Sequence, residues 1–260
     1  MGGYLPQFVR IEALHGLGAL LSTAAAKRCI LLLGSFVVGL AALPTWGMSS
    51  SGKLEAVSRM PPGPFLKRFL VASAVWNAAV GLINPFAGPF FVGYLTMSVR
   101  SAGTYFSVAQ LVQAGAVLVV TPWILRKLGL LSGIFGAQLL TGLALVTIIS
   151  GRSLIHAEVL FCVFMSAQHM SESGIQTLLM NRIPQEGRSD AAATNYLVVA
   201  LGQSCAAAAG GFVLGSYGYP RTLRLAGCFV VVAAIVFRLL CGSTDTVAST
   251  DGAALASGAA

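Results

Sequence analysis

Long apolar runs alternate with short polar connections along most of the chain. After residue 68 there are six such runs, near 69–96, 102–125, 129–149, 158–180, 190–215 and 224–241. Each is long enough to cross the hydrocarbon core of a bilayer, roughly 30 Å thick, as a tilted helix. A further run covers residues 29–46. Backbone groups in lipid must be hydrogen-bonded internally, and no alternating barrel pattern appears. The sequence therefore predicts an all-α polytopic membrane protein with about seven transmembrane helices.

The connection at 47–68 is the longest internal stretch without an apolar run. It contains a Ser-Ser-Ser-Gly cluster, a Pro-Pro-Gly-Pro cluster and four basic residues, a composition typical of a linker. We therefore expect residues 1–46 to be the end of an N-terminal helical bundle and 69–242 to be a six-helix unit. Residues 243–260 are small and polar, which predicts a disordered tail.

The run at 158–180 carries polar residues on one helical face. His169, Glu172 and Gln176 are spaced at i, i+3 and i+7. His169 lies about 16 Å from the start of this helix, near the centre of the bilayer. Ionisable groups at that depth are costly unless they face a cavity or a partner. We therefore expect the three residues to line a substrate or proton pathway. The alternative for His169 and Glu172 is a buried pair with a purely structural hydrogen bond.

The run at 69–96 also has a polar face. Its small and polar residues recur at steps of three and four: Ser73, Asn77, Gly81, Asn84 and Gly88. The amides of Asn77 and Asn84 are candidate substrate contacts in a cavity wall. A close-packing seam between helices is an equally good interpretation. Pro85 and Pro89 are expected to kink this helix.

Two other runs carry residues expected mainly to hold helices together. Ser107, Gln110 and Gln113 share one face of the 102–125 run. In the 190–215 run a stripe of small and polar residues predicts close contact: Asn195, Gly202, Ala206 and Gly210. The first three runs go from polar through intermediate to apolar in character, and the last three runs repeat this order. This pattern suggests two inverted three-helix repeats, as in many secondary transporters; chance is the alternative.

Composition excludes a soluble domain, because 56% of the chain is hydrophobic and only 9% is charged. A net charge of +8 would suggest nucleic acid in a soluble protein. Here the basic residues stand singly or in pairs between apolar runs, as in membrane loops. We expect a lipid bilayer as a partner and no nucleic acid. With the 47–68 linker in the cytoplasm, nine basic residues fall on that side and six on the other, which favours this orientation.

No enzyme motif is present, so we expect no catalytic residues and no cofactor. The five cysteines lie within or beside apolar runs without a C-x-x-C pair, and the three histidines are scattered. The sequence therefore supports neither a disulfide framework nor a metal site.

Several local motifs in residues 65–242 resemble the C-terminal half of a major facilitator superfamily transporter. Pro122 to Gly129, which contains Arg126 and Lys127, is similar to the basic cytoplasmic loop of that family, although it lacks the family's Asp and first Gly. Pro184 to Arg188 is similar to the family's Pro-x-x-x-Arg loop. A glycine-rich helix is similar to the one that packs against the other half, and its glycines are Gly202, Gly210, Gly211, Gly215 and Gly218.

This resemblance implies a multi-pass protein of the cell (inner) membrane that moves a small-molecule substrate by alternating access. The basic loop residues and Arg188 would then serve gating. The family has twelve helices in two bundles, so we expect this chain to be part of a longer protein, or to work with a second half or as a homodimer. The rival hypotheses are a non-transporting truncated membrane protein that acts as an interaction module, and a seven-helix receptor.

Overall fold

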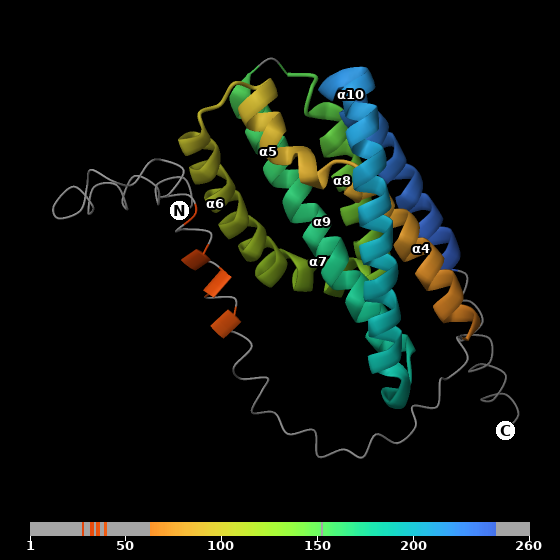
Figure 1. Ribbon diagram of the computed structural model, residues 1–260. Helices are drawn as coiled ribbons and strands as arrows, with labels where there is room; N and C mark the ends of the chain where they lie inside the picture. Colours follow the sequence, from red (N-terminus) through yellow and green to blue (C-terminus); the bar gives the residue numbers. More distant parts are fainter. Residues whose placement is uncertain are drawn as a thin grey trace, which may run out of the picture. The chain divides into compact units, whose positions relative to one another are not determined.

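The computed structural model describes residues 63–151 and 153–242, together with positions 28, 32, 33, 35, 36, 39 and 40. The described residues form helices joined by short turns and contain no strand (Figure 1), which confirms the all-α class. The described positions between 28 and 40 are helical. The rest of the predicted N-terminal bundle, the 47–62 part of the linker and the 243–260 tail lie outside the described residues.

Four helical stretches are long and apolar enough to cross a membrane, in agreement with a membrane protein. They are Pro64–Tyr94, Val99–Leu128, Leu130–Thr147 and Gln185–Gly242. The count of seven spans and the paired three-helix repeats go beyond these four and stay predictions. The described chain divides into two compact units: residues 97–108 belong to one, and 63–96 with 109–242 belong to the other. The site described below lies wholly in the second unit.

The first long helix, α4 (Pro64–Gly81), begins inside the range assigned to the linker, because Pro64 is well placed at a helix N-terminus. After α4 the regular α-helix is interrupted. A 3₁₀ turn, η1 (Asn84–Phe86), leads into the short α5 (Ala87–Pro89) and a π-helical turn, η2 (Phe90–Tyr94). The interruption coincides with Pro85 and Pro89 and confirms the predicted kink.

The next two predicted runs are helical close to the expected limits. Helix α6 (Val99–Gly115) continues through the π-helical η3 (Ala116–Val120) into α7 (Thr121–Leu128). Gly129 has a φ of 80° and separates α7 from α8 (Leu130–Thr147). A positive φ costs a glycine little, so this residue can make the turn.

The last helices include the one with the polar face. Helix α9 (Leu154–Arg182) starts at Ser153, whose side chain accepts a hydrogen bond from the His156 backbone. After the η4 turn (Gln185–Gly187) comes α10 (Arg188–Gly242), which is two helices joined at Gly218 with a φ of 70°. Figure 1 shows the chain reversing direction there. The break falls between the predicted runs 190–215 and 224–241.

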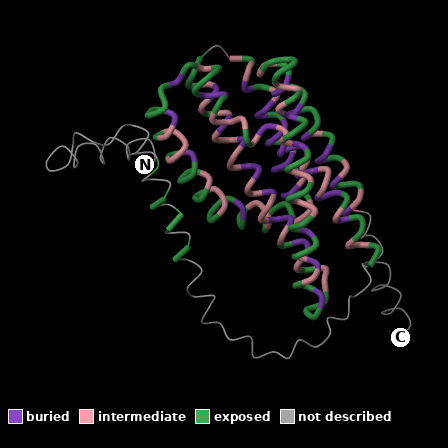
Figure 2. The backbone as a smooth tube through the Cα atoms, in the orientation of Figure 1, coloured by how far each residue is buried: buried purple, intermediate pink, exposed green. Residues whose placement is uncertain are grey.

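Glycines allow the closest contacts between these helices. Helix α10 packs against α4 and α8, and α8 packs against α9; the buried residues lie along these contacts (Figure 2). A Cβ added at Gly142 of α8 would lie 3.0 Å from the Gly227 carbonyl oxygen and 2.6 Å from Val231 Cγ2. A Cβ at Gly227 would lie 2.9 Å from the Gly142 carbonyl oxygen. Two backbones therefore touch where both side chains are missing.

A second glycine seam joins α4 and α10. A Cβ at Gly81 would lie 2.9 Å from Gln203 Cα, and one at Gly202 would lie 3.3 Å from the Ala74 carbonyl oxygen. Phe69 of α4 and Phe237 of α10 add an edge-to-face ring contact at 6.3 Å between centroids. The small-residue stripe expected in 190–215 is thus a close contact with α4.

Basic residues are unevenly distributed over the two ends of the helices in the second unit. Seven described basic residues lie near the starts of α4 and α10 or near the ends of α7, α9 and α10, namely Lys67, Arg68, Arg126, Lys127, Arg182, Arg188 and Arg238. Among the described residues of this unit, two basic residues lie at the opposite helix ends, Arg221 and Arg224 just after the Gly218 break. Basic residues accumulate on the cytoplasmic side of membrane proteins, so this distribution agrees with the orientation expected from the sequence, which stays a prediction.

Cysteine labelling tests whether the first half of α10 crosses the membrane in that direction. Ser189 and Ser216 are both exposed and lie near opposite ends of the segment. In a cysteine-free background, Ser216→Cys should react with an impermeant maleimide added to intact cells. Ser189→Cys should react only after permeabilisation. Labelling of Ser189→Cys alone from outside would reverse the orientation, and labelling of both would exclude a spanning segment.

Candidate functional site

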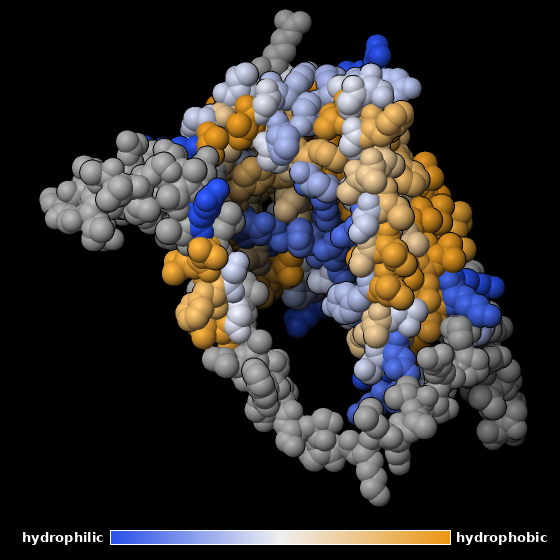
Figure 3. Space-filling model, in the orientation of Figure 1, coloured by the Kyte–Doolittle hydropathy of each residue, from blue (hydrophilic) through white to orange (hydrophobic). Residues whose placement is uncertain are grey.

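A cavity of about 600 Å³ lies between α4, the α6–η3 junction, α9 and the first half of α10. Its fifteen lining residues are Ser73, Asn77, Gln113, Ala114, Val117, Leu118, His169, Glu172, Ser173, Ile175, Gln176, Asn195, Tyr196, Val199 and Gln203. Ten of them have polar side chains, although most of the surface that lines the cavity is apolar. Figure 3 shows hydrophilic residues gathered in the middle of the viewed face, with hydrophobic residues flanking them.

One wall of the cavity is a hydrogen-bonded network between α4 and α10. Ser73 Oγ donates to Asn195 Oδ1 at 2.8 Å, and both residues are fully buried. Asn77 Nδ2 donates to the Ser73 carbonyl oxygen at 2.9 Å, and Asn77 Oδ1 accepts from Gln203 Nε2 at 3.0 Å. These bonds satisfy polar groups that would be costly in an apolar surrounding. They also hold the side chains of α4 and α10 in a fixed orientation at this wall.

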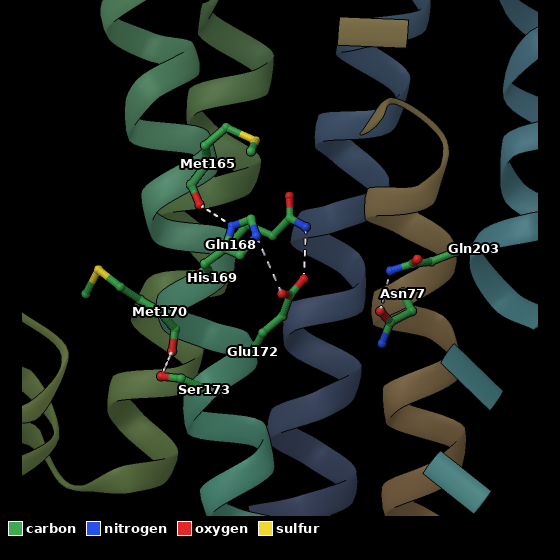
Figure 4. A network of polar contacts seen from close by, with 8 residues as sticks. All are labelled: Asn77, Met165, Gln168, His169, Met170, Glu172, Ser173 and Gln203. Carbon is green, nitrogen blue, oxygen red and sulfur yellow. Dashed lines mark hydrogen bonds and ion pairs between the residues drawn. The ribbon is translucent and has the colours of Figure 1, made fainter. Parts of the chain in front are cut away.

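The other wall is formed by α9 (Figure 4). Gln168 Nε2 donates to Glu172 Oε1 at 2.9 Å. His169 Nδ1 lies 2.8 Å from the Met165 carbonyl oxygen, and His169 Nε2 lies 4.0 Å from Glu172 Oε2. The His169 and Glu172 side chains are 32% and 34% exposed. The two ionisable groups are therefore held close together and remain reachable from the cavity.

The structure brings together most of the residues expected in the pathway. Asn77, His169, Glu172 and Gln176 all line the cavity. Asn84 does not, because α4 ends at Gly81 and Asn84 begins the 3₁₀ turn η1, which ends the predicted face. Its Oδ1 is buried without a hydrogen-bond partner among the described residues.

The residues expected at helix contacts are found in three places: in the cavity lining, on the exposed surface and at the glycine contact between α4 and α10. Gln113 lines the cavity, whereas Gln110 is exposed and does not. A Cβ at Gly210 would collide with the Leu82 carbonyl oxygen, and one at Gly211 would lie 3.4 Å from Phe86 Cζ. These two glycines therefore sit where α10 meets the end of α4.

The basic residues expected to serve gating lie at helix ends, away from the cavity lining. Lys127 Nζ lies over the Trp123 ring, 4.6 Å from its centroid, and Arg126 is exposed. Arg188 Nε donates to the Ile183 carbonyl oxygen at 3.2 Å, which closes the turn between α9 and α10.

Eight lining residues were not expected from the sequence: Ala114, Val117, Leu118, Ser173, Ile175, Tyr196, Val199 and Gln203. Ser173 lies one residue after Glu172, and Gln203 lies one residue after Gly202 of the predicted stripe. The helical spacing of Asn195, Val199 and Gly202 was a usable signal, because it places them on a common face. The spacing does not reveal that this common face contacts the cavity.

The described residues contain no group of three metal-ligating side chains. In comparisons of the whole chain, no protein-family model, no curated protein and no solved structure matches it.

Proposed function

We propose that this protein is an integral membrane protein that binds a small solute in the α4–α9–α10 cavity and moves it across the bilayer by alternating access. The observation that carries the proposal is the group of polar residues around this cavity. Ten polar lining residues converge where α9 meets three of the stretches that are apolar enough to cross a membrane, Pro64–Tyr94, Val99–Leu128 and Gln185–Gly242. Polar groups inside a membrane are costly and usually serve a pathway or a binding site.

The exposed surface supports the membrane part of the proposal. Large apolar side chains are exposed on several helices, among them Leu143, Leu197, Phe212, Val232, Ile235 and Leu239. An apolar surface of this kind is suited to lipid and unsuited to water.

A second six-helix bundle completes the proposed transporter. The cavity opens on one face of a single set of helices, and alternating access needs a second set that rocks against the first. This bundle comes from the same longer protein, from a separate half or from a second copy of the chain. The resemblance to half of a major facilitator superfamily transporter is part of this proposal.

Cysteine accessibility in the cavity tests alternating access without knowledge of the substrate. Ser173 lines the cavity, whereas Ser171, two residues earlier on α9, is fully buried elsewhere. In a cysteine-free background, Ser173→Cys should react with a hydrophilic thiol reagent from either side of a sealed vesicle. Ser171→Cys should stay unreactive. Reaction of Ser173→Cys from one side only would favour the rival function, a non-transporting membrane protein.

A further inference from the structure

The tautomer of His169 follows from its neighbour. Nδ1 lies 2.8 Å from the Met165 backbone carbonyl oxygen, which can only accept a hydrogen bond. Nδ1 therefore carries the proton. In the neutral imidazole the other nitrogen, Nε2, then presents a lone pair and acts as an acceptor.

Glu172 presents a second acceptor beside the first. Its Oε1 accepts from Gln168, a buried residue that is 3% exposed. This bond turns Oε2 toward His169, and Oε2 and Nε2 are 4.0 Å apart, too far for a hydrogen bond between them. Figure 4 shows both atoms on the same side of α9. Two hydrogen-bond acceptors, Glu172 Oε2 and His169 Nε2, thus lie near each other, and a donor could bind to both at once.

The charges of the other lining residues also favour a cationic hydrogen-bond donor as the bound group. Neither lysine nor arginine occurs among the described residues that line it, and Glu172 is the one carboxylate there. The titratable residues in the lining are His169, Glu172 and Tyr196, and α8, which packs on α9, contributes none. Gln113 Oε1 also lines the cavity and is buried without a partner in the described chain. The described lining therefore holds one carboxylate and no lysine or arginine to balance it.

We propose that the solute bound in this cavity carries an ammonium group, which bridges Glu172 Oε2 and His169 Nε2. An ammonium nitrogen about 2.8 Å from each atom would make an angle of about 90° between the two acceptors, about 20° below the tetrahedral angle, so each hydrogen bond would bend by about 10° and stay within the preferred range. Val117, Leu118 and Val199 offer an apolar wall to the rest of the molecule. A carboxylate or phosphate would meet the Glu172 charge with no cation to offset it. The proposal rests on the proposed function and names its substrate class.

Three probes of nearly equal shape test the charge preference: 2-phenylethylammonium, 2-phenylethanol and 3-phenylpropionate. Binding to the purified chain in detergent is measured by titration calorimetry. The ammonium probe should bind at least about tenfold more tightly than the alcohol, as expected for a charge-assisted hydrogen bond. The carboxylate should bind more weakly than either.

Two variants separate the site from a general charge effect. Glu172→Gln should reduce ammonium binding to the level of the alcohol and leave alcohol binding unchanged. Glu186→Gln removes the same charge from the exposed η4 turn and should change nothing. Equal binding of the ammonium and alcohol probes, tighter binding of the carboxylate, or an ammonium preference that survives Glu172→Gln would overturn the proposal. Because Ser173→Cys accessibility uses no ligand, alternating access is judged separately.

Discussion

Replacing Gly142 with leucine is expected to lower the thermal unfolding midpoint by about 6–12 °C. The new side chain would meet the Gly227 carbonyl and Val231 where the two backbones touch, so α8 and the second half of α10 must move apart. Overpacking of a well-packed contact costs about 1–3 kcal/mol, and contact with rigid backbone puts this site at the upper end. A loss of about 1 kcal/mol shifts the midpoint by about 2–4 °C in a chain of this size.

Gly136→Leu is the matched control. Gly136 lies on the same helix, is exposed, and a Cβ there would meet no described atom within 4 Å. Both substitutions replace a helical glycine by a better helix former. Gly136→Leu should therefore leave the midpoint unchanged or raise it slightly. Thermal melting of both variants in the same detergent gives the comparison, and equal midpoints would mean that the Gly142–Gly227 contact is not close.

Charge reversal at Glu172 is expected to reverse the charge preference of the cavity. In Glu172→Lys the cavity loses its one carboxylate and gains an ammonium group beside His169. Two unit charges about 4 Å apart interact by about 4 kcal/mol at an effective dielectric constant near 20. We therefore expect ammonium binding to fall at least about 100-fold, and 3-phenylpropionate to become the preferred probe.

The control for this variant is Glu186→Lys, which makes the same change of net charge in the exposed turn between α9 and α10. It should retain the ammonium preference of the unmodified chain. Calorimetric titration of both variants with the ammonium and carboxylate probes is the measurement. If Glu172→Lys still prefers the ammonium probe, the carboxylate does not set the selectivity.

Helix positions could be predicted from the sequence because they depend on local pattern. The runs 129–149 and 158–180 correspond to α8 and α9 within a few residues. The shared face of His169, Glu172 and Gln176 also follows from helical spacing alone, and all three residues line the cavity. Such features need no knowledge of how helices pack.

Features that depend on packing between helices were harder to predict. Gln113 was expected at a helix contact and lines the cavity, because spacing identifies a face but not what it meets. Asn84 was assigned to the α4 face by spacing, although it precedes Pro85. The residue before a proline is disfavoured in the α region, and the helix ends at Gly81. If the effect of Pro85 on the preceding residue is given more weight than the helical spacing, the predicted polar face of this helix ends one turn earlier.

The polarity of α9 has a consequence for biogenesis. This helix carries His169 and Glu172 of the site, and it is not among the four stretches that are apolar enough to cross a membrane by themselves. Charged and strongly polar residues at the centre of a helix oppose its entry into lipid from the translocon. Gly174 of α9 packs directly on Ile134 of α8, so a neighbour is available to shield it. If the protein is the transporter proposed above, we expect α9 to insert cooperatively with its flanking helices, so that the binding site forms only after they have been synthesised.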